Sequence, residues 1–150
     1  MYLKATIIFA VFILGLMLFS CSSANNGNIP AFKKFLIGNG GGATGMMTGY
    51  LIDSTGDLYS WNGRSMEDNL RKISQFDNEK ITELNDLLLN NGIYEYDYQK
   101  PYNIYHFMKI TTETKENYIV WNPSFDNDSI KFNNQIFEKI MNLIENNTGE

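Results

Sequence analysis

The sequence predicts an α+β fold: a single antiparallel sheet of about five strands, with two helices packed on one face. Short apolar segments separated by Gly-, Asn- and Asp-rich turns indicate strands joined as hairpins, and such strands pair antiparallel. Two other segments carry apolar residues at helical spacing and polar residues on the opposite side, so each needs a sheet face to cover. The predicted element order is β-β-β-α-β-β-α.

Three strands are predicted in the first half of the chain, at residues 32–37, 46–52 and 58–61. A glycine-rich segment, residues 38–45, connects the first two. The Asp-Ser-Thr-Gly sequence at residues 53–56 predicts a tight turn, because glycine tolerates positive φ. The second and third strands should therefore form a hairpin.

The first helix has the clearest signals. Residues 62–75 give no clear pattern and fit either a short helix or an extended segment. Asp77 then predicts an N-cap, and Asn91-Gly92 predicts a C-terminal stop, so the helix should span residues 78–90. Its apolar stripe consists of Ile81, Leu84 and Leu88.

The second half contains a further hairpin and a second helix. The hairpin strands are predicted at residues 104–110 and 118–121, and Pro101 should interrupt any strand before them. The last helix is predicted at residues 132–145, with an inward face of Ile136, Phe137, Ile140, Met141 and Ile144. Its polar face consists of Asn134, Gln135, Glu138, Lys139, Asn142 and Glu145.

The N-terminus indicates export. Lys4 precedes an apolar run, Ala5–Phe19, which is followed by Ser20 and Cys21, the single cysteine of the chain. This order is typical of a secretory signal peptide. The tetrad Leu-Phe-Ser-Cys that ends at Cys21 resembles the lipobox of bacterial lipoproteins. That resemblance implies cleavage after Ser20 and attachment of diacylglycerol to the Cys21 sulfur.

The expected organisation is therefore a signal peptide at residues 1–20, a lipidated cysteine and flexible tether at 21–30, and a single α+β domain at 31–147. Two or more acyl chains such as palmitate anchor a protein stably where one does not. Ser22 after the cysteine suggests the outer membrane, if the bacterium has one. The alternative is an uncleaved anchor, but 15 helical residues span about 22 Å against a hydrocarbon core of about 30 Å.

Charge and cysteine content exclude some classes of function. The formal net charge is −5, and it becomes −6 when Lys4 is removed. An acidic chain lacks the basic surface that holds a phosphate backbone, so no nucleic-acid partner is expected. Because Cys21 carries the lipid, no disulfide can form within the mature chain, and burial must supply the stability.

Three motifs resemble chemical sites, and each has a more economical structural interpretation. Gly40–Gly45 matches the pattern G-x-G-x-x-G, but a strand rather than a helix follows it, which favours a wide hairpin turn or bulge over a nucleotide site. His106 is the sole histidine, and no G-x-S-x-G elbow accompanies it, which favours a structural role. Asp126–Ser129 offers oxygen ligands but lacks the Gly and Glu of an EF-hand, which favours a helix cap. No metal, cofactor or catalytic residue is predicted.

Aromatic residues are the best functional lead. Tyr94, Tyr96 and Tyr98 would lie on one side of an extended segment and form a candidate binding edge. Further aromatic residues lie in the predicted strands: Tyr50, Tyr59, Trp61, Tyr105, Tyr118 and Trp121. Since the helices cover one face of the sheet, some of these rings should remain on the open face, where amphipathic rings suit a protein or glycan partner. Ordinary packing is the competing interpretation.

Taken together, the motifs favour a lipid-anchored, non-enzymatic binding or envelope-assembly module. The alternative is a hydrolase that acts on envelope polymer. The Gly40–Gly45 segment and the later Pro101-Tyr102-Asn103 segment also resemble those of small uncharacterised bacterial lipoproteins. That resemblance implies no catalytic residues.

Overall fold

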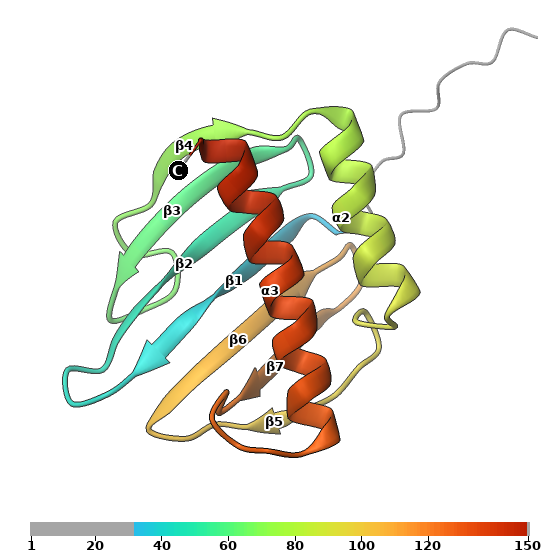
Figure 1. Ribbon diagram of the computed structural model, residues 1–150. Helices are drawn as coiled ribbons and strands as arrows, with labels where there is room; N and C mark the ends of the chain where they lie inside the picture. The colour runs from blue at the N-terminus through green and yellow to red at the C-terminus, as the bar shows by residue number, and fades with distance from the viewer. Residues whose placement is uncertain (1–31, 150) are drawn as a thin grey trace, which may run out of the picture.

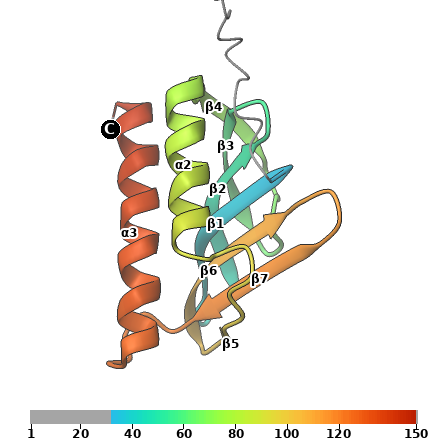
Figure 2. The same cartoon turned by 90° about the vertical axis from the view of Figure 1, so that its right-hand side faces the viewer.

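The computed structural model describes residues 32–149 and shows two layers, a sheet and a pair of helices (Figure 2). The signal peptide, Cys21 and the tether predicted before residue 31 lie outside the described residues. The elements in chain order are β1 (Lys34–Gly41), β2 (Met46–Asp53), β3 (Asp57–Gly63), β4 (Arg71–Gln75), α2 (Asn78–Asn90), β5 (Gln99–Lys100), β6 (Ile104–Thr111), β7 (Glu116–Trp121) and α3 (Asp128–Thr148).

The α+β class and the single sheet are confirmed, but the prediction of about five antiparallel strands is wrong. The sheet has seven strands in the order β4-β3-β2-β1-β6-β7-β5. It is mixed because β5 runs parallel to β7, while every other pair is antiparallel. The two additional strands are the short edge strands β4 and β5, whose sequences lack the alternation that marks longer strands. Pro101 follows β5 directly, as expected of a residue that cannot continue a ladder.

β1 is the central strand, and it continues into the glycine-rich segment that was predicted to be a loop. It pairs with β2 and β6 along its whole length, from Lys34 to Gly41. Gly38 lies opposite Gly49 in this ladder. A Cβ atom at Gly49 would lie 3.0 Å from the Trp61 ring, and one at Gly38 would lie 3.1 Å from the Phe107 ring. The neighbouring backbone is closer still, since a Cβ atom at Gly38 would clash with the Thr48 carbonyl oxygen and one at Gly49 with the Ile37 carbonyl oxygen. Glycine is therefore needed here because the adjacent strand backbone, together with the two rings, leaves no room for a side chain.

The helix α2 was predicted with the correct bounds. Asp77 accepts a hydrogen bond from the Lys80 amide at its N-terminus. At its C-terminus Gly92 has φ +65°, and the Ile93 amide donates to the Leu88 carbonyl at 2.9 Å. This is the 6→1 hydrogen bond of a Schellman motif.

The helix α3 is longer than predicted, because Asn127 caps it one turn earlier and it continues to Thr148. The inward face is confirmed for Ile136, Phe137, Ile140 and Ile144, which are buried. Asn134 was predicted to face water, yet it is half-buried. Its side-chain oxygen accepts a hydrogen bond of 2.8 Å from the Trp121 indole, which explains the difference.

Both helices pack on the same face of the sheet, and α3 crosses that face diagonally (Figure 1). The main core lies between these layers and includes Phe35, Ile52, Leu84, Ile110 and Ile140. A second, smaller apolar cluster lies on the opposite face of the sheet. Within residues 32–149, neither helix combines the length and apolar character needed to span a bilayer.

Candidate functional site

The three tyrosines predicted as a binding edge do not share one exposed side. Residues 91–95 form a turn, and Tyr94 is buried with 8% of its surface exposed. Its hydroxyl donates to the Asn85 side chain at 2.9 Å, and burial raises its pKa to about 12. Tyr96 and Tyr98 are half-buried and stacked, with ring centroids 6.2 Å apart. The turn departs from the predicted extended segment, but the three rings do share one side, because Tyr94 belongs to the main core and Tyr96 and Tyr98 pack against it. A binding role for these residues stays a prediction.

The two loop motifs have structural roles. Gly40–Gly45 ends β1 and turns directly into β2, so the hairpin interpretation is confirmed. In the second motif, the Asn127 side chain accepts a hydrogen bond from the Ile130 amide at 3.0 Å, so the helix-cap interpretation is confirmed. Across residues 32–149, no group of three or more His, Cys, Asp or Glu side chains is close enough to hold a metal ion.

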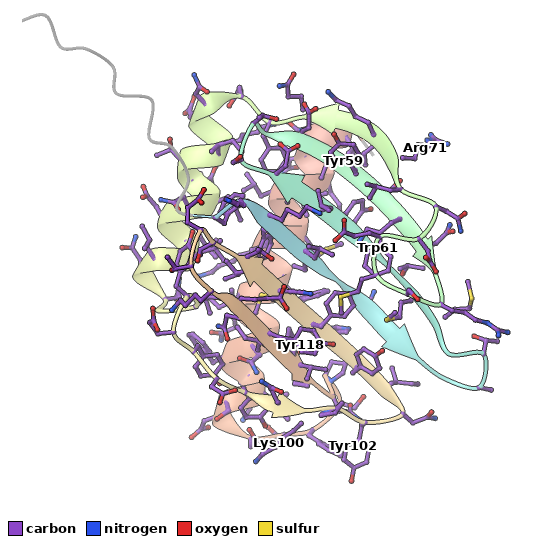
Figure 3. All side chains as sticks on the ribbon, turned by 180° about the vertical axis from the view of Figure 1, so that it is seen from behind. Tyr59, Trp61, Arg71, Lys100, Tyr102 and Tyr118 are labelled. Carbon is purple, nitrogen blue, oxygen red and sulfur yellow. The ribbon has the colours of Figure 1, made fainter. Side chains whose placement is uncertain are left out.

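The strand aromatics divide between the two faces of the sheet. Tyr50 and Trp121 belong to the helix side. The open side carries a cluster that we call the aromatic face, made of Leu36, Met47, Leu51, Tyr59, Trp61, Met66, Tyr105, Phe107, Tyr118 and Val120. Figure 3 shows three of its rings, Tyr59, Trp61 and Tyr118, against the back of the sheet.

The centre of the aromatic face is covered by its own side chains. Phe107 is fully buried and Trp61 is 3% exposed, and their ring centroids are 5.9 Å apart. Met66 packs on the cluster from the segment after β3, and an ion pair of 2.9 Å between Lys34 and Glu67 ties that segment to β1. Burial, with a smaller contribution from Tyr105, raises the pKa of Tyr118 to about 12. The aromatic face is thus a second small core with a partly exposed tyrosine rim.

A row of polar side chains on the helix side was not predicted. His106 of β6 pairs with Asn39 of β1, Asn39 pairs with Thr48 of β2, and Thr48 pairs with Asn62 of β3. We call these four residues the polar row. Four residues closer to the start of β1, the equivalent row is entirely apolar: Ile110, Phe35, Ile52 and Leu58. The helix side therefore changes from apolar to polar along the strands.

The ends of β1 and β3 and the start of β2 extend past α3 (Figure 1). The strand register places Asn39, Thr48 and Asn62 of the polar row in these segments. A hollow of about 250 Å³ lies over Asn39, Thr48, Ser60 and Asn62, and Met141 of α3 forms its wall. A neighbouring hollow of about 370 Å³ shares Met141 and runs along α3. Its lining residues are His106, Phe137, Glu138, Met141, Asn142 and Glu145. We call the two hollows together the α3 groove.

His106 forms the end of the groove floor. Its ring stacks on Phe137 with centroids 4.3 Å apart and meets Trp121 edge-on at 5.6 Å. Burial lowers the pKa of His106, so the imidazole is neutral at pH 7. Its Nδ1 atom is buried and has no hydrogen-bond partner among the described residues. The structural role predicted for this histidine fits the ring packing, and the position also places it in the groove.

The remaining members of the row were missed because Asn39 was assigned to a loop. Once β1 is extended to Gly41, the alternation places Asn39 on the same side as Phe35 and Ile37. Polar residues at alternate positions of the second and third strands, Thr48 and Asn62, then become neighbours. Each strand has a polar residue at a position that faces the helices. Only the register between the strands shows that these residues are neighbours.

Comparison with known proteins assigns no relative. No protein-family model matches the chain, and a search of curated proteins finds no significant match. The similarity to small bacterial lipoproteins inferred from the glycine-rich and Pro101–Asn103 segments therefore stays a prediction. The candidate site rests on the geometry of the α3 groove.

Proposed function

We propose that this protein is a lipid-anchored binding module of a bacterial envelope and that it holds its ligand in the α3 groove without catalysing a reaction. One observation carries the proposal. The polar row occupies the side of the sheet on which the helices build the core, yet Asn39, Thr48 and Asn62 are exposed. Polar groups that converge on a concave surface fix the orientation of a ligand.

The anchor would be the lipid on Cys21, and the groove would lie toward the end of β1 that is farther from the tether. Residues 22–31 can span at most about 35 Å when fully extended. The first described residues lie at the start of β1, and Asn39 follows Lys34 by five positions, or about 17 Å along the strand. A ligand in the groove would therefore be held at the part of the domain away from the tether, on the outer membrane if the bacterium has one.

A hydrolase that acts on envelope polymer is the second candidate. His106 and Glu138 line the same hollow, so a base and a carboxylate are near each other. A nucleophile and its base must also be within hydrogen-bond reach, and the base must be oriented by a third group. Among residues 32–149, no side chain hydrogen bonds to Nδ1 of His106. Binding without catalysis is therefore the function that the geometry supports best.

Photocrosslinking in intact cells tests the binding role. A benzophenone amino acid replaces Thr48 in the groove or Glu83 on the exposed side of α2, and adducts are identified by mass spectrometry. We expect an adduct from position 48 and none from position 83, because both are exposed but only the first faces the groove. Equal yields at the two positions, or none at either, would contradict the proposal.

The hydrolase is tested separately with the purified protein and isolated cell-wall polymer. We expect no release of soluble fragments. Fragment release that His106→Gln abolishes would replace the binding module with the enzyme. Retention of the fold by His106→Gln is checked by circular dichroism.

The aromatic face stays a proposal as a second contact surface for a protein partner. Tyrosine, tryptophan and methionine are enriched at protein interfaces, and Tyr59, Tyr105 and Tyr118 form the half-buried rim of this face. Because Trp61 and Phe107 at its centre are buried, the aromatic face offers a partner less apolar surface than the number of aromatic residues in the strands suggested.

A further inference from the structure

The α3 groove carries neutral hydrogen-bonding groups at a regular spacing. Each asparagine amide offers two donor hydrogens and an acceptor oxygen, and the Thr48 hydroxyl both donates and accepts. The Asn62 oxygen accepts from Asn69 at 3.3 Å, whereas Asn39 and Thr48 make no side-chain hydrogen bond within residues 32–149. Cross-strand neighbours are about 5 Å apart, which is close to the length of one ring in a sugar chain.

The charged groups of the groove disfavour an anion. The charged side chains that line it are Glu138 and Glu145, and within the described residues no lysine or arginine lines it. Phosphate or carboxylate groups would therefore meet like charge without a compensating cation. Carboxylates do accept hydrogen bonds from hydroxyl groups, so the same glutamates suit a neutral polyhydroxyl ligand.

The groove also offers apolar contacts beside its polar groups. Tyr50 and Met141 are half-buried in its floor and wall, and Phe137 packs on the His106 ring at its end. Sugar rings present hydroxyl groups at their edges and C–H groups on their faces. A surface that combines amides, hydroxyls and carboxylates with apolar side chains can contact both the hydroxyl edges and the C–H faces of such rings.

From these observations we infer that the α3 groove binds a neutral oligosaccharide, laid across β3, β2, β1 and β6 with its hydroxyl groups on the polar row. This assignment rests on the proposed function of the groove as a ligand site and names the class of ligand. A cationic peptide is the competing occupant, because the glutamates would attract it.

The test is an NMR titration of the full-length, ¹⁵N-labelled protein in detergent micelles. The probes are cellotetraose, maltotetraose and tetra-N-acetylchitotetraose, with tetragalacturonate as the anionic counterpart and tri-lysine as the cationic one. We expect at least one neutral probe to shift the amide signals of the polar row saturably and tetragalacturonate to shift them less. Failure of all three neutral probes to do so overturns the saccharide assignment.

A matched pair of variants locates the site. Asn39→Ala should weaken binding of the neutral probe about 5- to 10-fold, because it removes the amide that contacts the ligand. Asn90→Ala makes the same chemical change at an exposed position on α2 and should leave affinity unchanged. Equal affinity in both variants overturns the assignment, and thermal unfolding of each variant checks that the fold is retained.

The outcomes separate the two proposals. Saturable shifts of the polar row by tri-lysine, and not by the neutral probes, would refute the saccharide assignment and leave the groove as a ligand site. Adducts from position 48 in cells, together with no saturable shifts from any neutral probe, would likewise refute the saccharide assignment and leave the groove as a ligand site. Absence of adducts at position 48 would refute the binding role itself.

Discussion

Replacing Ile140 with alanine tests the docking of α3, because this residue is fully buried at the middle of the helix. The truncation removes buried methyl and methylene groups and leaves a cavity between α3 and the sheet. Such changes cost about 2–5 kcal/mol of unfolding free energy, a large part of the about 5–15 kcal/mol typical of a whole domain. We therefore expect a folded but clearly weakened protein.

The assay is thermal unfolding of the chain from Asn26 to Glu150, which we expect to fold as a soluble domain. For about 120 residues the unfolding entropy is roughly 0.25 kcal/mol/K, so each 1 kcal/mol lowers Tm by about 4 °C. Ile140→Ala should then lower Tm by about 8–20 °C, and the milder Ile140→Val should cost about 0.5–1.5 kcal/mol.

The control is the neighbouring residue Lys139, which is exposed on the same helix. Lys139→Ala should change the unfolding free energy by no more than about 0.5 kcal/mol, since it removes no buried group. If Ile140→Ala unfolds at the same temperature as Lys139→Ala, then α3 does not dock by the face described above, and the wall of the α3 groove is misplaced.

The other predictions concern the anchor, the tyrosines and the groove histidine. Cys21→Ala should abolish incorporation of an alkyne fatty acid in cells, and equal labelling of wild type and variant would refute the lipid anchor. Tyr94→Ser should cost about 3–5 kcal/mol in thermal unfolding because the ring is buried, whereas Tyr96→Ser and Tyr98→Ser should each cost less. A combined Tyr96→Ser/Tyr98→Ser variant that unfolds normally but loses a captured partner would support the binding edge. Because burial lowers the pKa of His106 in the folded state, the unfolded state binds more protons as pH falls through about 6.5. Wild type should therefore lose stability from pH 7 to pH 5 more steeply than His106→Gln in urea unfolding, and parallel pH profiles would contradict the assigned burial.

Local signals in the sequence were sufficient for the helices and most of the hairpins. Asp77 and Gly92 define both ends of α2 through hydrogen bonds within a few residues of each other. The alternation in β6 correctly places Phe107 and Met108 on opposite faces of the sheet. These features depend on residues that are close together in the sequence, so they can be predicted from one sequence alone.

Strand pairings between segments that are distant in the sequence could not be predicted from such local patterns. β1 pairs with β6, which lies about seventy residues further along the chain. β5 pairs in parallel with β7 and forms the edge of the sheet opposite to β4. Both pairings depend on how the strands before α2 and the β6–β7 hairpin after it pack together to bury their apolar side chains. The glycines of β1 also have low intrinsic strand preference, but the close approach of neighbouring backbone and aromatic rings leaves no room there for a larger residue.

The sequence by itself therefore determined the α+β class, the bounds of α2, the inward face of α3 and the acidic, cysteine-poor character of the chain. Only the tertiary structure decided the seven-stranded mixed sheet, the burial of Tyr94 and the α3 groove. The physical reason is the register between strands. His106, Asn39, Thr48 and Asn62 lie on four strands, and only the ladder hydrogen bonds that align those strands bring them into one row.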